Sequence, residues 1–269
     1  MKKTLIWIAA IIITLGSSVY QRLTGPTHPL RIKTELNGSE YDLKLTRSAT
    51  IGKDCEVNVP NNSEFNRALL IFHKYPGNFE TDTIEMQLKD NSYIAVLPEQ
   101  PPAGKIQYYI SLYKNDLEVF NNSKNTAIIR FKGDVPAAVL IPHILAMFIS
   151  MLFAIVSLLM AVSNIGNYKL MSYLTFGSLV LGGFILGPII QYYAFGDAWT
   201  GWPIGKDLTD NKTLIAVIFW IIAIVLNVKK DRKWTIIVAA IIMIIIFSIP
   251  HSAGGSEFNY ESGTIETGL

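Results

Sequence analysis

Apolar and polar residues follow two different patterns along the 269-residue chain. Between residues 22 and 134 charges are dense, and apolar side chains often alternate with charged ones, as Leu30, Ile32 and Leu36 do. Four later stretches carry no charge, at 135–168, 170–196, 213–228 and 234–256. Each is long enough, or nearly so, to cross an apolar layer of ~30 Å at ~1.5 Å per residue. The pattern therefore predicts an integral membrane protein with a separate polar domain.

The polar segment 22–134 is typical of a β-sheet domain. Alternation with a period of two recurs at 41–46 and 84–88, and it predicts strands with one buried face. Further strands are predicted at 68–73, 92–97, 106–113, 116–120 and 126–132, separated by turn-forming residues. Seven to nine short strands in a segment of this length predict an all-β sandwich.

The remainder of the chain is predicted to be helical and to lie in the membrane. Residues 4–21 are apolar and follow Lys2 and Lys3, a pattern shared by signal peptides and membrane anchors. We expect an uncleaved anchor at 1–21, because no small-x-small cleavage site follows. Residues 135–256 are expected to form a four-helix transmembrane domain, and residues 257–269 an external tail. Gly183 and Gly187, four residues apart, favour close helix packing.

Basic residues predict the orientation, since lysines and arginines concentrate in short cytoplasmic loops. Lys2 and Lys3 place the N-terminus in the cytoplasm, and the cluster at 229–233 falls on the same side when the crossings are counted. The β domain, the loop 191–213 and the C-terminus are then expected on the outer side of the membrane, opposite the cytoplasm.

The composition narrows the classes of partner. Half of the residues are hydrophobic and 16% are charged, which fits contact with a lipid bilayer. The net charge of +2, spread along the chain, argues against nucleic-acid binding. Cys55 is the only cysteine, so an intramolecular disulfide and a thiolate metal cluster are excluded. The sequence defines no oligomeric state.

Candidate functional residues gather at the predicted outer face of the membrane domain, where ionisable groups are expected to face a polar pocket. The histidines His143 and His251 each follow a proline near the outer end of a predicted helix. The candidates for metal binding are His143, His251, Asp197, Asp207, Asp210 and Glu257. The other outer-face candidates are Gln191, Trp199, Trp202 and Lys212.

Three uses of this outer face remain open. His143 and His251 could ligate a b-type haem, or the two imidazoles and a carboxylate could hold a divalent metal. Alternatively, the polar groups could be structural, with Thr209 or Asp210 capping a helix and the tryptophans lying at the membrane interface. No compact metal-binding spacing such as HExxH is present, so every ligand would come from a separate segment.

Two resemblances add expectations. Residues 105–112, KIQYYISL, resemble the penultimate strand of immunoglobulin-like and fibronectin type III domains, in which a tyrosine bonds back at a corner. The chain also resembles uncharacterised bacterial inner-membrane proteins with a periplasmic immunoglobulin-like domain and a four- to five-helix membrane domain. The residues that carry this second resemblance are Gly133-Asp134-Val135-Pro136, Ile141-Pro142-His143, Ala194-Phe195-Gly196, Trp199-Thr200-Gly201, Asp207 to Lys212 and Ile249-Pro250-His251-Ser252.

The sequence therefore favours a non-catalytic binding or accessory component of an envelope assembly, with the immunoglobulin-like domain as its contact surface for envelope proteins. A haem- or metal-binding protein that uses His143 and His251, for electron transfer or hydrolysis, is the alternative. A transporter is a further alternative, although the apolar runs carry no charge at mid-membrane depth.

Overall fold

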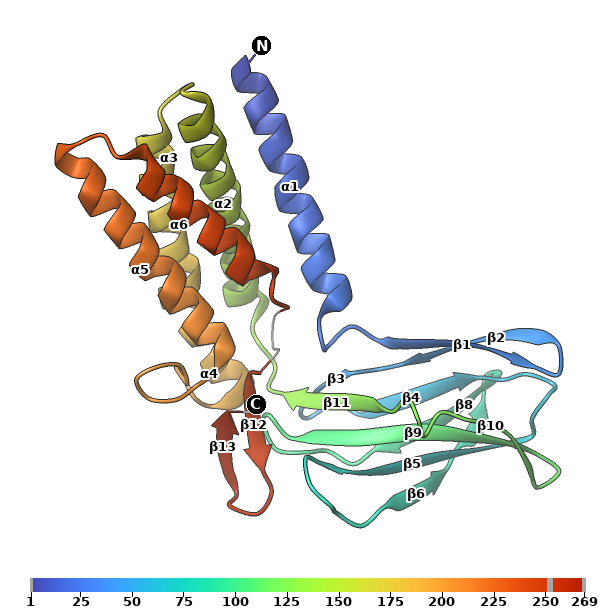
Figure 1. The fold of residues 1–269 in the computed structure, drawn as a ribbon. Coiled ribbons are helices and arrows are strands. Elements are labelled where there is room, and N and C mark those ends of the chain that lie inside the picture. Colours follow the sequence, from blue (N-terminus) through green and yellow to red (C-terminus); the bar gives the residue numbers. More distant parts are fainter. Residues whose placement is uncertain (1, 251–253, 268–269) are drawn as a thin grey trace. The chain divides into compact units, whose positions relative to one another are not determined.

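The computed structural model describes residues 2–250 and 254–267 and contains both apolar helices and β-sheets, with 28% of residues in strands (Figure 1). The chain divides into two compact units. The β unit comprises Thr27–Asp134 and Glu257–Glu266, and the helical unit contains Met1–Pro26 and Val135–Ser256. The predicted combination of β-sheets with membrane-type helices is confirmed.

The β unit is built from short antiparallel strands with one parallel pair. Its first strands are β1 (Leu30–Leu36), β2 (Ser39–Leu45), β3 (Ser48–Thr50), β4 (Cys55–Pro60), β5 (Arg67–Tyr75), β6 (Asp82–Glu85) and β7 (Gln87–Lys89). They are followed by β8 (Ser92–Leu97), β9 (Lys105–Lys114), β10 (Leu117–Asn121), β11 (Ala127–Lys132), β12 (Ser256–Asn259) and β13 (Thr264–Thr267).

Two of the sheets carry most of the β unit. The larger has the order β3-β11-β9-β5-β6, with β10 paired to β9, and β3 runs parallel to β11. The smaller has the order β4-β8-β7. The hairpins β1-β2 and β12-β13 form separate two-stranded sheets.

The strands of the β unit share one hydrophobic core. Along β9 the alternate side chains Ile106, Tyr108, Ile110 and Leu112 are at most 1% exposed. They pack with the buried faces of β2, β4, β5, β8 and β11. The period-two pattern therefore identified the core face of the central strand correctly.

Three local features differ from the sequence expectation. The chain forms eleven strands between residues 30 and 132, more than the predicted seven to nine, because β3 and β4 were not recognised. The predicted strand at 84–88 is divided at Met86, since β6 pairs in the larger sheet and β7 in the smaller one. Leu88, expected to be buried, is therefore 57% exposed. The C-terminal segment also differs from a plain tail, because it forms β12 and β13.

The tyrosine expected at a strand corner makes a long-range contact instead. The hydroxyl of Tyr108 donates to the carbonyl oxygen of Thr46 at 2.7 Å, which lies 62 residues upstream. A tyrosine corner bonds to the backbone only a few residues upstream. Tyr108 thus connects β9 to the segment that precedes β3.

The helical unit contains long apolar helices (Figure 1). They are α1 (Lys2–Thr24), α2 (Ala137–Ser163), α3 (Tyr168–Leu179), the π-helix η1 (Val180–Leu186), α4 (Gly187–Phe195), α5 (Leu208–Lys229) and α6 (Lys233–Ser248). Among the described residues, four helical stretches are long and apolar enough to cross a membrane: α1, α2, the continuous stretch Tyr168–Phe195 and α5. The fifth predicted crossing corresponds to α6, which is shorter at 16 residues.

Side-chain bonds establish how the helix ends align. Lys233 Nζ donates to Asn164 Oδ1 at 2.7 Å, and Lys169 Nζ donates to the carbonyl of Asn227 at 3.2 Å, so the α2–α3 and α5–α6 turns lie at one end. At the opposite end Gln21 Nε2 donates to the carbonyl oxygen of Phe247 at 2.9 Å. The N-terminal end of α1 therefore lies at the same end of the helical unit as the two turns.

Glycines in the third membrane stretch allow the helices to approach closely. A Cβ at Gly182 would lie 3.1 Å from the Cβ of Ala146 on α2, and one at Gly183 would collide with Thr213 on α5. These contacts agree with the predicted role of the glycines in helix packing. The packing occurs within η1, whose wider turn changes which side chains face α2 and α5.

Candidate functional site

Asp207, predicted as an outer-face residue, lies at the centre of a buried hydrogen-bond network. It caps the N-terminus of α5, and its Oδ1 accepts hydrogen bonds from the backbone N–H groups of Thr209 at 2.7 Å and Asp210 at 3.4 Å. Its Oδ2 accepts from the N–H of Ser256 at 2.8 Å and from the Ser256 hydroxyl at 3.0 Å. The capping residue is thus Asp207, rather than the expected Thr209 or Asp210.

Asp210 orders the loop between α4 and α5. Its Oδ2 accepts from the backbone N–H of Thr200 at 2.7 Å and lies 3.4 Å from the Thr200 hydroxyl. That hydroxyl accepts from Gln191 Nε2 at 2.6 Å and lies 3.2 Å from the Ser256 hydroxyl. Gln191, Asp207 and Asp210 therefore belong to one hydrogen-bond network.

Lys212 lies at the same end of the helical unit and bonds to backbone carbonyl groups. Its side chain is buried, and Nζ donates to the backbone carbonyls of Ile249 at 3.1 Å and Pro250 at 3.3 Å. These carbonyls follow the C-terminus of α6, where helical hydrogen-bond partners run out. Carbonyl groups at a helix C-terminus favour a nearby cation, so Lys212 stabilises the contact between α5 and the end of α6.

His143 lies on α2 and contacts the π-helix. Its Nδ1 is 2.9 Å from the carbonyl oxygen of Gly182, so this nitrogen carries the hydrogen and Nε2 is left as the acceptor. The same hydrogen-bond arrangement orients many metal-ligating imidazoles. His251, its proposed partner for haem or metal, lies outside the described residues.

The remaining predicted residues do not converge on one centre. Asp197 is exposed in the loop after α4, whereas Glu257 belongs to the β unit, where its Oε2 lies 2.6 Å from Lys105 Nζ. Trp202 is exposed, and Trp199 packs against Phe184 with ring centroids 5.4 Å apart. Within the part of the chain that the structure describes, no group of three or more histidine, cysteine, aspartate or glutamate side chains is arranged to hold a metal ion.

The network around Asp207 and Asp210 has the character of a structural element. Asp207 uses both carboxylate oxygens to accept four hydrogen bonds, three of them from backbone N–H groups. A metal ion at this position would have to displace these hydrogen bonds, which costs free energy in a buried site. The network therefore stabilises the loop 196–207 and the start of α5.

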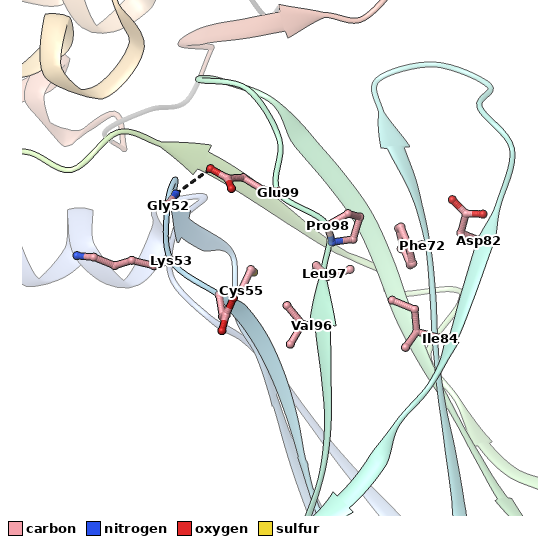
Figure 2. Close-up of a pocket in the computed structure, with 11 residues that line it drawn as sticks. Gly52, Lys53, Cys55, Phe72, Asp82, Ile84, Val96, Leu97, Pro98 and Glu99 are labelled. Atoms are coloured by element: carbon pink, nitrogen blue, oxygen red, sulfur yellow. Dashed lines mark hydrogen bonds between the residues drawn. The ribbon is translucent and has the colours of Figure 1, made fainter.

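The β unit contains a cleft that the sequence analysis did not identify. It has a volume of about 600 Å³ and opens between the two main sheets, with β5 and β6 on one side and β4 and β8 on the other (Figure 2). A volume of this size falls within the range of ligand clefts, ~300–1,000 Å³. The lining residues are Gly52, Lys53, Asp54, Cys55, Phe72, Asp82, Ile84, Val96, Leu97, Pro98 and Glu99.

The cleft has an apolar interior. Figure 2 shows Phe72 and Ile84 across the cleft from Leu97 and Cys55. Phe72 is 7% exposed and Cys55 is 6% exposed, while Ile84 is half-buried. Burial raises the pKa of the Cys55 thiol to about 11, so the thiol is neutral and behaves as a small apolar group.

The mouth of the cleft is acidic. Asp54, Asp82 and Glu99 are exposed there, and Glu99 Oε1 accepts a hydrogen bond from the N–H of Gly52 at 2.8 Å. The single lysine at the mouth, Lys53, pairs with Asp134 at 3.0 Å, which offsets its charge. The cleft thus combines an apolar interior with a negatively charged mouth.

The loop that forms one rim of the cleft is held by the C-terminal hairpin. The hydroxyl of Tyr260 accepts from the backbone N–H of Lys105 at 3.1 Å and lies 2.9 Å from Gln100 Oε1. The backbone N–H of Phe258 donates to the carbonyl of Ala103 at 3.1 Å. The ion pair between Lys105 and Glu257 is largely buried, with side-chain exposures of 18% and 13%. β12 and Tyr260 therefore order the segment 100–105, which directly follows the cleft residues Pro98 and Glu99.

Sequence reasoning missed the cleft because its lining comes from four separate segments. The alternation of Cys55, Val57 and Val59 with polar residues would have revealed β4. No sequence signal, however, shows that the start of β4 and β6 lie on opposite sides of a cleft. No protein-family model, curated protein or solved structure is significantly similar to this chain.

Proposed function

We propose that this chain is a non-catalytic binding component of a bacterial envelope assembly, anchored in the inner membrane with its β unit on the periplasmic side. The observation that carries the proposal is the cleft between the two main sheets, an open site with an apolar interior and no evident catalytic set. By contrast, the carboxylates of Asp207 and Asp210 in the helical unit already accept hydrogen bonds from backbone N–H groups. Binding is therefore assigned to the β unit and anchoring to the helices.

An immunoglobulin-like fold for the β unit is part of this proposal, and the strand order supports it. The immunoglobulin fold has strands B, E and D adjacent in one sheet and strands C, F and G in the other. The order β4-β8-β7 matches B-E-D, and the order β11-β9-β5 matches G-F-C. The extra edge strand β6 then takes the place of C′, and β3, parallel to β11, lies beside G. Domains of this class commonly bind other proteins.

The placement of basic residues supports the proposed orientation. Seven lie at the end of the helical unit that contains the two turns, and three lie toward the other end. The seven are Lys2, Lys3, Lys169, Lys229, Lys230, Arg232 and Lys233, and the three are Arg22, Lys206 and Lys212. Since cytoplasmic loops are rich in lysine and arginine, the first end is assigned to the cytoplasm.

The orientation is tested by labelling single cysteines in intact cells with a membrane-impermeant maleimide. We expect Leu117→Cys, on an exposed position of β10, to be labelled, whereas Lys230→Cys is labelled only after permeabilisation. The parent chain is the blank, because its Cys55 is buried. Labelling of Lys230→Cys but not of Leu117→Cys in intact cells would reverse the assignment.

The binding role is tested by photo-crosslinking from the cleft. A photoreactive amino acid at Val96, which lines the cleft and is 45% exposed, should yield a discrete covalent adduct in cells. The same amino acid at the exposed Glu40 of the β1-β2 hairpin is the matched control. Identical patterns from both positions would refute a binding role for the cleft.

The haem or metal alternative rests on His143, whose Nδ1 contact with Gly182 leaves Nε2 able to act as a ligand. It stays a prediction, since His251 lies outside the described residues. An absorption spectrum and metal analysis of the purified chain, with His143→Ala as the comparison, would decide it: bound haem or metal that is lost in the variant would favour this alternative.

A further inference from the structure

The cleft of the β unit has three features that together define what it can bind, and the inference below rests on the binding role proposed above. The first is its shape. The interior side chains Leu97, Phe72 and Cys55 are at most 7% exposed, so only a narrow group such as a single side chain can reach them. A chain segment that lies across the mouth and inserts one aliphatic side chain fits this shape.

The second feature is the charge at the mouth. Asp54 and Asp82 form no ion pair within the described residues, and there the carboxylate of Glu99 bonds only to the backbone N–H of Gly52. Carboxylates that border a low-dielectric interior focus a negative potential. A lysine or arginine next to the inserted aliphatic side chain is therefore favoured, and an acidic segment is repelled.

The third feature is the free edge of β6, which borders the cleft. β6 pairs with β5 on one side, and no described strand pairs with its other side. Met86 N donates to the carbonyl oxygen of Ala68 on β5. In an antiparallel pair every second residue bonds to the partner strand, so Ile84 and Asp82 also direct their N–H and C=O groups toward β5. Thr83 and Glu85 then direct their N–H and C=O groups outward, where an added strand can bond to them.

The side chains of β6 have the matching arrangement. Asp82 and Ile84 line the cleft, and the residues between and beyond them face the other way. A strand added along this edge would likewise present every second side chain to the cleft. One aliphatic side chain would lie near Ile84, and a basic one within reach of Asp82 and Glu99.

We propose that the cleft binds an extended polypeptide segment that adds as a strand along the free edge of β6, inserts an aliphatic side chain between the sheets, and places basic side chains against Asp82 and Glu99. The partner is thus a protein with an exposed segment in which basic and aliphatic residues recur at every second position.

The proposal is tested with three fluorescein-labelled peptides and the purified full chain in detergent, using fluorescence anisotropy. The basic peptide has the sequence SKTITKS, the acidic one SETITES, and the third, SKTSTKS, lacks the aliphatic side chain. We expect the basic peptide to bind at least about tenfold more tightly than either of the others, with an affinity that falls as salt rises. Equal binding of the basic and acidic peptides would overturn the charge assignment.

Two sets of variants separate the charge of the mouth from the strand edge. The double variant Asp82→Asn, Glu99→Gln retains a side-chain oxygen that can accept from the Gly52 N–H. Its affinity for the basic peptide should be about tenfold lower, as expected for the loss of two exposed ion pairs. The control is Glu35→Gln, Glu40→Gln, which removes the same charge from the β1-β2 hairpin and should leave affinity within about twofold. If both double variants bound the basic peptide with equal affinity, the assigned contacts with Asp82 and Glu99 would be overturned.

The edge is tested with Thr83→Pro. Its N–H points away from β5, so proline removes the outward donor and leaves the internal ladder intact. We expect an unchanged circular dichroism spectrum and a loss of peptide binding. Folded Thr83→Pro that binds as the parent chain would overturn strand addition; if this variant is unfolded, the matched replacement Thr83→N-methylated threonine decides the same point.

The two proposals can fail separately. A crosslinked adduct from Val96 together with no preference for the basic peptide would leave the binding role in place and reject this class of partner. Failure of both measurements would reject the binding role as well.

Discussion

Replacing Asp207 tests whether the polar network in the helical unit is structural. In Asp207→Asn the amide oxygen can still cap α5, because asparagine and aspartate are comparable caps. The other oxygen, which accepts from Ser256 N at 2.8 Å and Ser256 Oγ at 3.0 Å, becomes an NH₂ group. A donor then faces the backbone N–H of Ser256, in a position where both residues are buried.

The expected magnitude follows from these contacts. Replacing the acceptor of a buried N–H group by a donor costs about 1–3 kcal/mol, so Asp207→Asn should lower the free energy of unfolding by about that amount. Asp207→Ala also loses the helix cap, which adds about 0.5–2 kcal/mol. The exposed Asp197 provides the control, since Asp197→Asn should change stability by less than about 0.5 kcal/mol.

The assay is denaturant unfolding in mixed micelles, followed by circular dichroism, for the parent chain and the three variants. The predicted order of stability is parent and Asp197→Asn, then Asp207→Asn, then Asp207→Ala. Equal stability of Asp207→Asn and Asp197→Asn would refute the reasoning. If a chelator instead destabilised the parent chain and left Asp207→Asn unaffected, Asp207 would be a metal ligand.

The remaining predictions concern packing, the C-terminal hairpin and the buried thiol. Gly183→Ala should destabilise the helical unit by about 1–3 kcal/mol, because its new methyl group collides with Thr213 on α5. The control Gly177→Ala, whose methyl group has no such neighbour within 4 Å, should be neutral or slightly stabilising. Both variants are measured in the same micelle assay. Tyr260→Phe removes the acceptor for the N–H of Lys105. Backbone amides at 100–105 should then exchange hydrogen faster, by a factor equivalent to about 1–3 kcal/mol, as measured by mass spectrometry. Unchanged exchange in this segment would contradict the role of the hairpin. The alkylation rate of Cys55 at pH 8 should be roughly 10²–10³-fold lower than that of a free cysteine, because burial raises the pKa of the thiol to about 11. For the same reason the rate should keep rising with pH, without a plateau, up to pH ~10. The stability linked to this raised pKa is present below pH ~8.5 and is lost as the pH rises through about 11, so a plateau near pH ~9 in the folded chain would contradict the burial.

The fold was predictable from sequence wherever one local period decided burial. The alternation along β9 and the uncharged run in α2 identified a buried strand and an apolar helix within a few residues of their bounds. Prediction failed where pairing decided the outcome. The alternation at 84–88 continues smoothly through Met86, although the chain changes sheets there, and no local residue pattern marks that change.

The candidate site was only partly predictable, for a related reason. The sequence placed Gln191, Asp207 and Asp210 at one predicted outer face, because the order of the apolar runs brings these residues to one end of the helical unit, and in the structure they share one hydrogen-bond network. It did not reveal that Asp207 is the cap, since any of several polar residues before an apolar run can cap a helix. The choice depends on Ser256, which lies 49 residues away and completes the bonds of the carboxylate.

The sequence by itself determined the division into a polar β-rich segment and apolar helices, and the unequal distribution of basic residues between the helix ends. Both follow from transfer free energies and local periodicity, which each segment expresses without its neighbours. Only the tertiary structure decided the cleft and the Asp207 network. Their residues come from separate strands and loops, and a cleft exists only where two sheets that share a core separate at one end, a property of their packing that no single segment contains.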